Sequence, residues 1–168
     1  MPLFNPDAIA RLRREHEITR GLPSERVIVH HGVESIEGRP ALVMEDLGAE
    51  SLAAFIARER PELPARIALA IEIAAALAAL HQRDIVHGDV NPSNVVVAPG
   101  GARIKVIDFG LASWIRPVDA SGAPRSRRFG VVEGTLGYLA PEQTGRLGRA
   151  VDHRADLYSL GATLYELL

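Results

Sequence analysis

Three polar residues, Asp89, Asn94 and Asp108, have the types and spacing of a site for phosphoryl transfer. Asp89 and Asn94 lie in the run His-Gly-Asp-Val-Asn-Pro-Ser-Asn at residues 87–94, and Asp108 opens Asp-Phe-Gly at residues 108–110. Such a site needs a carboxylate to orient an attacking hydroxyl and accept its proton, and an amide and a second carboxylate to hold Mg²⁺ on a nucleotide. Taken alone, Asp89 could equally be a solvated loop carboxylate, so the joint spacing carries the hypothesis.

The segment between Asn94 and Asp108 predicts how these two residues meet. Residues 94–98 are typical of a short buried strand, residues 99–101 (Pro-Gly-Gly) of a turn, and residues 102–107 of the returning strand. Because a hairpin starts and ends at the same edge, we expect Asn94 and Asp108 to face one site.

These motifs resemble those of the protein-kinase family, whose catalytic loop is H-R-D-x-x-x-x-N and whose metal-binding motif is D-F-G. Downstream, residues 133–142 (Glu-Gly-Thr-Leu-Gly-Tyr-Leu-Ala-Pro-Glu) are similar to the end of a kinase activation segment. Residues 156–161 (Asp-Leu-Tyr-Ser-Leu-Gly) are similar to the start of the long helix that follows in that fold. The resemblance is closest to the N-terminal Ser/Thr-kinase module of large bacterial proteins that also carry an ATPase and a sensor histidine kinase.

The resemblance implies a role for each residue of the catalytic loop. Asp89 would be the catalytic base, and Asn94 and Asp108 would be the Mg²⁺ ligands. Asn91 stands where the family has a lysine, so it loses a positive charge but could still donate a hydrogen bond to the γ-phosphate. Gly88 replaces the family's arginine, which removes a phosphate contact used in activation.

The resemblance also implies an adenine site at residues 42–48, which are similar to the last small-lobe strand and the hinge. Met44 would occupy the gatekeeper position, and backbone groups of Glu45 and Leu47 would contact the adenine edge of ATP. Val96 would form the apolar floor under the adenine, with an ordinary core valine as the alternative.

A helix is predicted near the N-terminus. Residues 5–7 (Asn-Pro-Asp) supply an N-cap, a proline at the first helical position and an acid in the first turn, and Gly21 ends the helix. If this is the kinase C-helix, Glu15 is the acid that pairs with the lysine that anchors the nucleotide. A solvated helix glutamate like the nearby Glu17 is the alternative.

The other predicted elements alternate between strands and helices. We expect strands at residues 26–33 and 40–47 and a helix at residues 51–60 that is capped by Ser51. We also expect a helix that is apolar nearly all round at residues 64–80 and an irregular loop at residues 114–129. The most apolar stretch, residues 67–80, is too short for a membrane span and carries Glu72, so we expect a buried helix there. The loop stands where an activation loop belongs. The candidate phosphorylation sites of this region are Ser113, Ser121, Ser126 and Thr135, and the arginines that could pair with phosphate are Arg125, Arg127 and Arg128. The alternative is that these are ordinary loop residues.

The resemblance implies an incomplete α+β, protein-kinase-like fold. Residues 1–47 would form a partial small lobe with the C-helix and two or more strands. Residues 48–168 would form a partial, mainly helical large lobe. No G-x-G-x-x-G occurs, and of 19 lysine and arginine residues only Lys105 is lysine. Lys105 lies on the strand that leads to Asp108, with its side chain on the opposite side from its neighbours or in solvent, so we expect that it cannot replace the anchoring lysine.

Composition excludes some functions. The net charge of −2 gives no electrostatic reason to expect nucleic-acid binding, and the absence of cysteine excludes disulfides and thiolate metal sites. The N-terminal residues lack the apolar core of a signal peptide. We therefore expect a cytoplasmic protein without a membrane segment.

Two functions follow from these patterns. The first is a protein serine/threonine kinase that uses ATP and Mg²⁺ and acts on a protein substrate, here as a fragment that could belong to a parent with ATPase and histidine-kinase domains. The second is a catalytically inactive, pseudokinase-like binding module, which the missing lysine and glycine loop favour. A third hypothesis rests on residues 16–20 (His-Glu-Ile-Thr-Arg), which are superficially similar to the phosphoacceptor box of sensor histidine kinases. No nucleotide-binding glycine boxes follow them.

Overall fold

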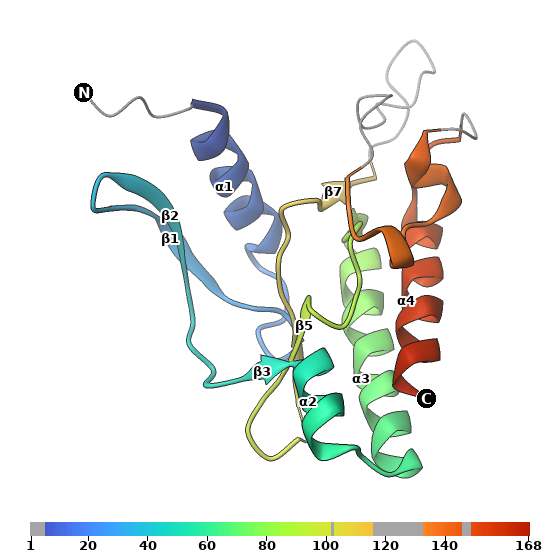
Figure 1. Ribbon diagram of the computed structural model, residues 1–168. Helices are drawn as coiled ribbons and strands as arrows, with labels where there is room; N and C mark the ends of the chain where they lie inside the picture. The colour runs from blue at the N-terminus through green and yellow to red at the C-terminus, as the bar shows by residue number, and fades with distance from the viewer. Residues whose placement is uncertain (1–5, 102, 116–132, 146–148) are drawn as a thin grey trace.

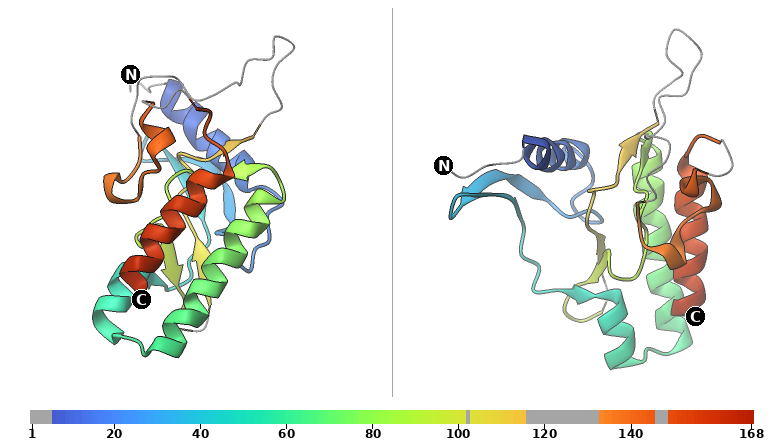
Figure 2. Two further views of the ribbon diagram at one scale, coloured as in Figure 1. Left: turned by 90° about the vertical axis from the view of Figure 1, so that its right-hand side faces the viewer. Right: turned by 45° about the horizontal axis from the view of Figure 1, so that its top comes forward.

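The computed structural model describes residues 6–101, 103–115, 133–145 and 149–168, which form an α+β fold (Figure 1). Helix α1 (Pro6–Thr19) packs against a two-stranded sheet made of β1 (His30–Ile36) and β2 (Arg39–Met44). The larger part contains two helices that lie side by side, α3 (Leu63–His81) and α4 (His153–Leu167), as the views in Figures 1 and 2 show. A three-stranded sheet packs against α3.

Helix α1 confirms the predicted N-terminal helix. Its expected cap, Asn5, lies outside the described residues. The chain leaves the helix through Gly21, whose φ of +78° lies in the left-handed region that glycine adopts without strain. Ile18 is buried at the inner face of the helix and joins the main hydrophobic core.

The predicted strand at residues 26–33 is wrong in its extent, because its two halves pair with different partners. Val27 forms a parallel bridge to Val106, whereas β1 begins only at His30 and continues to Ile36. Glu37 and Gly38 make the turn to β2, both at positive φ (48° and 75°) as two-residue hairpin turns require. Residues 34–36, which lie beyond the predicted strand, extend β1, because the outer end of a two-stranded sheet can expose such residues to water.

A bulge at the start of β1 decides which histidine faces the core. His30 is opposite Met44 and Gly32 is opposite Val43, so His31 is the extra residue. His30 is consequently 8% exposed, and His31 is exposed. A bulge can redirect a side chain in this way without disturbing the rest of the ladder.

The hairpin between Asn94 and Asp108 is confirmed. Strand β5 (Val95–Val97) pairs antiparallel with β6 (Ile104–Val106), and β5 also pairs with β3 (Glu50–Ser51). The alternating residues that face α3 are buried in the core: Val95, Val97, Ile104 and Val106. The backbone N–H of Ile107 donates to the Asn94 carbonyl over 2.9 Å. The open end of the hairpin therefore bonds Asn94 to the residue that directly precedes Asp108.

Helix α2 (Leu52–Glu59) and helix α3 were predicted, but α3 is buried on one face only. Ser51 caps α2 by accepting a hydrogen bond from the Ala54 N–H over 3.2 Å. One apolar stripe of α3 is buried, at Leu69, Ile73, Leu77 and Leu80. The other contains Ile67 and Ile71, which are 46% and 60% exposed, so the expectation of a helix buried all round is wrong for that face.

Helix α3 also corrects the expectation about length. It has 19 residues. By length and composition, it is the one helix in the described parts of the chain that could cross a membrane. The core helix of a soluble protein meets the same criteria, and the buried stripe of α3 belongs to the main hydrophobic core.

The remaining elements surround the region of residues 87–94. Strand β4 (Ile85–Val86) pairs antiparallel with β7 (Ser113–Trp114), so Trp114 lies in a strand rather than in the predicted loop. Residues 116–132, which include Ser121, Ser126 and the three loop arginines, lie outside the described residues. Two short 3₁₀ helices, η1 (Leu136–Tyr138) and η2 (Pro141–Thr144), contact α4.

Candidate active site

Asp89 and Asn94 are in direct contact. The Asn94 Nδ2 donates to the Asp89 Oδ2 and to the Asp89 backbone carbonyl, each over 2.9 Å. Because the Asn94 Nδ2 donates to both of these Asp89 oxygens, the amide is oriented with its nitrogen toward Asp89. The Asn94 Oδ1 is then the side-chain atom that could bind a cation. Asn94 is 9% exposed, so the surrounding atoms restrict rotation of its amide.

Asp108 follows the hairpin in an uncommon backbone conformation. Its φ is +61°, in the left-handed region that few residues other than glycine occupy, and such strain gathers at functional sites. The Gly110 N–H donates to the Asp108 Oδ1 over 3.1 Å. The carboxylate is exposed and lies at the same end of the hairpin as Asn94.

Asn94 and Asp108 offer oxygen atoms, which suit a hard cation such as Mg²⁺. Mg²⁺ usually takes one or two carboxylates from the protein and completes its shell with substrate phosphates and water. Accordingly, the described residues contain no group of three or more His, Cys, Asp or Glu that could hold a metal alone. A cation here would depend on ligands supplied by a bound phosphate compound.

The second oxygen of Asp89 is held by the segment that precedes η1. The Thr135 N–H donates to the Asp89 Oδ1 over 2.8 Å. Gly134 makes this approach possible at φ +127°, because a Cβ there would lie 2.8 Å from the Leu139 Cδ1 and 3.4 Å from Asp89. Thr135, predicted only as a phosphorylation site, is thus a neighbour of Asp89.

Asn91 is placed inside the loop and is 2% exposed. Its Nδ2 donates to the Asp89 carbonyl and to the Thr135 Oγ1, each over 3.1 Å, and its Oδ1 accepts from the Ser93 N–H over 2.9 Å. The amide therefore ties Asp89 to Thr135 in this structure. A contact with a γ-phosphate stays a prediction.

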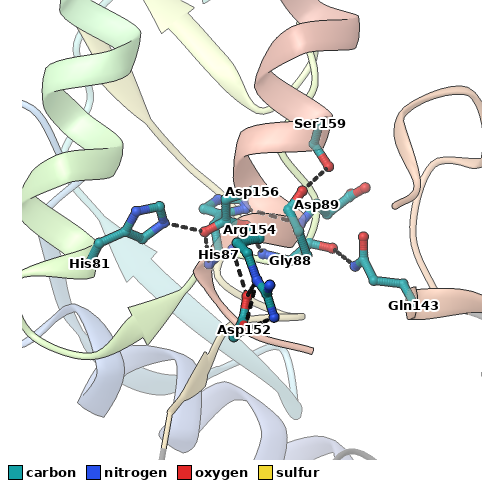
Figure 3. A network of polar contacts seen from close by, with 10 residues as sticks. His81, His87, Gly88, Asp89, Gln143, Asp152, Arg154, Asp156 and Ser159 are labelled. Atoms are coloured by element: carbon teal, nitrogen blue, oxygen red, sulfur yellow. Dashed lines mark hydrogen bonds and ion pairs between the residues drawn. The ribbon is translucent and has the colours of Figure 1, made fainter. Parts of the chain in front are cut away.

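Asp156 fixes the backbone on which Asp89 is carried, and the sequence did not reveal this role. Its fully buried carboxylate accepts hydrogen bonds from the backbone N–H groups of His87 and Gly88, both over 2.8 Å (Figure 3). It also lies 2.9 Å from the His81 Nε2. The available signal was an acid at the start of an otherwise mainly apolar helix, but its partners lie far upstream in the sequence.

Gln143 is a second residue that the sequence did not single out. Its Nε2 donates to the Gly88 carbonyl over 2.8 Å, and its Oε1 accepts from the Ala140 N–H over 3.0 Å. Gly88 is therefore held through its N–H by Asp156 and through its carbonyl by Gln143, as Figure 3 shows. These two contacts restrain the residue immediately before Asp89.

Glu15 reaches the Asp-Phe-Gly motif from α1. Its Oε1 accepts the Phe109 N–H over 3.1 Å. Burial raises the pKa of Glu15, the bond from Phe109 opposes this, and the nearby Asp108 charge adds to the increase. A cavity of about 680 Å³, lined by Glu15, Phe109 and Gly110 together with Arg11 and Arg14, lies beside this contact. The only lysine of the chain pairs elsewhere, with Glu45.

Phe109 is packed between two histidines. The His87 ring lies 5.0 Å from the Phe109 ring, and the His30 ring lies 6.4 Å away in an edge-to-face arrangement. The His30 Nδ1 is 2.9 Å from the Thr19 Oγ1 on α1. Burial lowers the pKa of His30, and the nearby His16 and His31 act in the same direction.

His30 is expected to make stability depend on pH. Because its pKa is lower in the folded chain than in the unfolded chain, the unfolded chain binds more protons as the pH falls below about 6.5. The free energy of unfolding should therefore decrease between pH 7.5 and pH 5.5, as measured by urea denaturation. His30→Gln should reduce this dependence, and the control His31→Gln, at an exposed position, should retain it. An unchanged pH dependence in His30→Gln would contradict the assignment.

The four predicted adenine-site residues lie on two neighbouring parts of the fold. Met44 ends β2 and is 44% exposed, and Leu47 packs against the core. Val96 is opposite Lys105 in the β5–β6 register, and the Lys105 ammonium contacts Glu45. Of the two predicted placements of Lys105, the side opposite its buried neighbours Ile104 and Val106 is confirmed, and the placement in solvent is wrong.

The sequence of the chain matches a known family and known proteins. Residues 5–168 match the family described as protein kinase domain. The chain is 34% identical to the serine/threonine-protein kinase Pkn1 of Myxococcus xanthus, over 97% of this chain and 23% of that protein. It is 37% identical to the probable serine/threonine-protein kinase SCO3848 of Streptomyces coelicolor, over 98% and 24%. It is 36% identical to PknB of Mycobacterium tuberculosis, over 98% and 26%. The chain thus spans about a quarter of the length of these relatives.

Proposed function

The chain belongs to the protein kinase family, and on that premise we propose that it transfers the γ-phosphoryl group of ATP to a serine or threonine hydroxyl of a protein. The observation that carries the proposal is the arrangement of Asp89. Its carboxylate is held by the Asn94 amide and the Thr135 N–H, at the same end of the hairpin as Asp108. The Asn94 side chain thus contacts a positioned carboxylate, and Asp108 offers a second carboxylate at the same end of the hairpin.

Asp89 is the proposed catalytic base. Each of its oxygens accepts one hydrogen bond from Asn94 or Thr135, and a carboxylate has about four acceptor sites, so it can still accept a bond from a substrate hydroxyl. Asp89 would orient that hydroxyl and take its proton as the new phosphate ester forms. Asn91 would keep the loop in place for this step.

Asn94 and Asp108 are the proposed Mg²⁺ ligands, through the Asn94 Oδ1 and the Asp108 carboxylate. When bound, ATP would supply the phosphoryl group and Mg²⁺ would neutralise the charge on the phosphate oxygens. The adenine is proposed to lie between Val96 and the residues Met44, Glu45 and Leu47. Glu15 would keep Phe109, and hence Asp108, in its present position.

The proposed substrate is a protein, and the proposed location is the cytoplasm, where ATP is present. Because the chain spans about a quarter of its relatives, we also propose that it works within a larger protein. Companion ATPase and histidine-kinase domains are part of that proposal. They rest on the resemblance of the sequence alone.

A binding module without catalysis is the second candidate. The observation that favours it is the pairing of Lys105 with Glu45, since Glu15 then has no lysine partner within this chain. The two candidates differ in phosphoryl transfer. A binding module would bind ATP or a protein without transferring phosphate.

Transfer of labelled γ-phosphate from ATP to serine and threonine peptides tests the proposal. Asp89→Asn should lower the rate about 10²–10⁴-fold, because it removes the base but keeps the hydrogen-bonding shape. Asp84→Asn makes the same charge change at an exposed position before β4 and should leave the rate unchanged. ATP binding with no transfer in the unmodified chain would reject the catalytic proposal in favour of the binding module.

A further inference from the structure

Lys105 is a partly buried cation that the proposed transfer step does not use. It is the only lysine among 19 basic residues, and its side chain is 14% exposed. A charge removed from water needs a partner, and here the Lys105 ammonium contacts the Glu45 Oε1. The pair lies between β6, three residues before Asp108, and the segment that follows β2.

Glu45 is held by several contacts. Its Oε1 accepts the Val29 N–H over 2.8 Å as well as a bond from Lys105. Its backbone N–H donates to the Val29 carbonyl over 2.9 Å. Burial acts to raise the pKa of Glu45, but the bonds from Lys105 and Val29 outweigh it and the pKa is lowered. The carboxylate is therefore ionised and fixed beside Val29.

The ion pair joins Glu45 to the sheet that carries Val96. Lys105 and Val96 are directly opposite each other in the β5–β6 register. Their buried neighbours on both strands face the core, so these two side chains lie on the other face of the sheet. On the edge of β6 away from β5, the Val106 N–H donates to the Arg26 carbonyl over 2.9 Å. Residues 26–29, the start of the proposed hinge and the proposed adenine floor thus meet at one ion pair.

We propose that Lys105 and Glu45 form a positioning pair for the adenine end of the nucleotide site. The inference rests on the proposed function and deepens it. Without Lys105, the Glu45 carboxylate would turn to water and release the Val29 N–H, so the backbone of residues 45–47 would lose its fixed place beside Val96. The pair therefore governs adenine binding, whereas the triphosphate end depends on Asn94 and Asp108.

Dissociation constants of two ligands test this division. Lys105→Met should weaken Mg²⁺–ATP binding about tenfold, because it removes one charge-assisted contact. It should leave magnesium tripolyphosphate, which has no base, unchanged. Glu45→Gln should match it, and the double variant should be no weaker than either single variant. Arg103→Met, an exposed control on the same hairpin, should change neither constant.

Other outcomes would overturn the inference. Equal weakening of ATP and tripolyphosphate by Lys105→Met would show a general loss of structure. Unchanged ATP affinity would show that the pair does not position the adenine site. An additive double variant would show that the two residues act independently.

A measurement without nucleotide separates this inference from the proposed function. Because the chain has one lysine, acylation by acetic anhydride at a lysine side chain reports on Lys105 alone. Glu45→Gln should increase that acylation and speed amide exchange at Val29, whereas Glu50→Gln, which disturbs the exposed pair with Arg58, should change neither. Failure of the unmodified chain to bind ATP would reject the proposed function. Unchanged acylation and exchange in Glu45→Gln would reject the pair itself.

Discussion

Replacing Asp156 with alanine is expected to lower the free energy of unfolding by about 3–5 kcal/mol. The carboxylate is fully buried and accepts from the N–H groups of His87 and Gly88 and contacts His81. A buried donor without an acceptor costs about 1–3 kcal/mol, and alanine would leave the donors of all three residues unpaired. A domain of this size has a total stability of about 5–15 kcal/mol, so the loss is a large share of it.

Urea denaturation of Asp156→Ala measures this effect, with Asp152→Ala as the control. Asp152 lies at the start of the same helix, where it accepts the Arg154 N–H over 2.9 Å as an N-cap. Loss of such a cap costs about 1 kcal/mol. Equal losses in the two variants would contradict the view that Asp156 supports the Asp89 loop from inside the protein.

Asp108→Ala is expected to remove the dependence of ATP binding on Mg²⁺. Asp108 and the Asn94 Oδ1 are the oxygen donors at the open end of the hairpin, and a single amide oxygen holds Mg²⁺ poorly. The affinity for ATP measured by calorimetry should therefore be the same in MgCl₂ and in EDTA. Asp46→Ala removes an exposed carboxylate near the proposed hinge and should retain the dependence. A retained Mg²⁺ dependence in Asp108→Ala would reject Asp108 as a ligand.

The parts of the site that the sequence predicted depend on local spacing. Asn94 and Asp108 are brought to one edge by a hairpin of thirteen intervening residues, whose strand and turn pattern is explicit in the sequence. The helix that carries Glu15 was also predicted from its start and stop residues, but the choice of Glu15 came from the resemblance to the kinase C-helix. For the hairpin, the local strand and turn pattern was enough to bring the two ends together.

The parts that were missed depend on contacts between distant segments. Asp156 and Gln143 act on Gly88 from 68 and 55 residues away, and no periodicity in the sequence shows such a pairing. The bulge that turns His30 toward Phe109 depends on one extra residue, His31, inside the predicted strand, and the strand pattern did not show it. The contact between Lys105 and Glu45 spans 60 residues and was missed for the same reason.

The thermal unfolding of the unmodified chain with ATP, with and without Mg²⁺, tests most directly whether the chain has the proposed metal–nucleotide site at Asn94 and Asp108. At a nucleotide concentration of 100 times the dissociation constant, binding should stabilise the chain by about 2.7 kcal/mol, or about 5–10 °C for its size. The increase should appear with ATP and Mg²⁺ together and be lost when EDTA removes the metal. No increase in the melting temperature with ATP and Mg²⁺, or the same increase in EDTA, would contradict a metal-dependent nucleotide site in this chain.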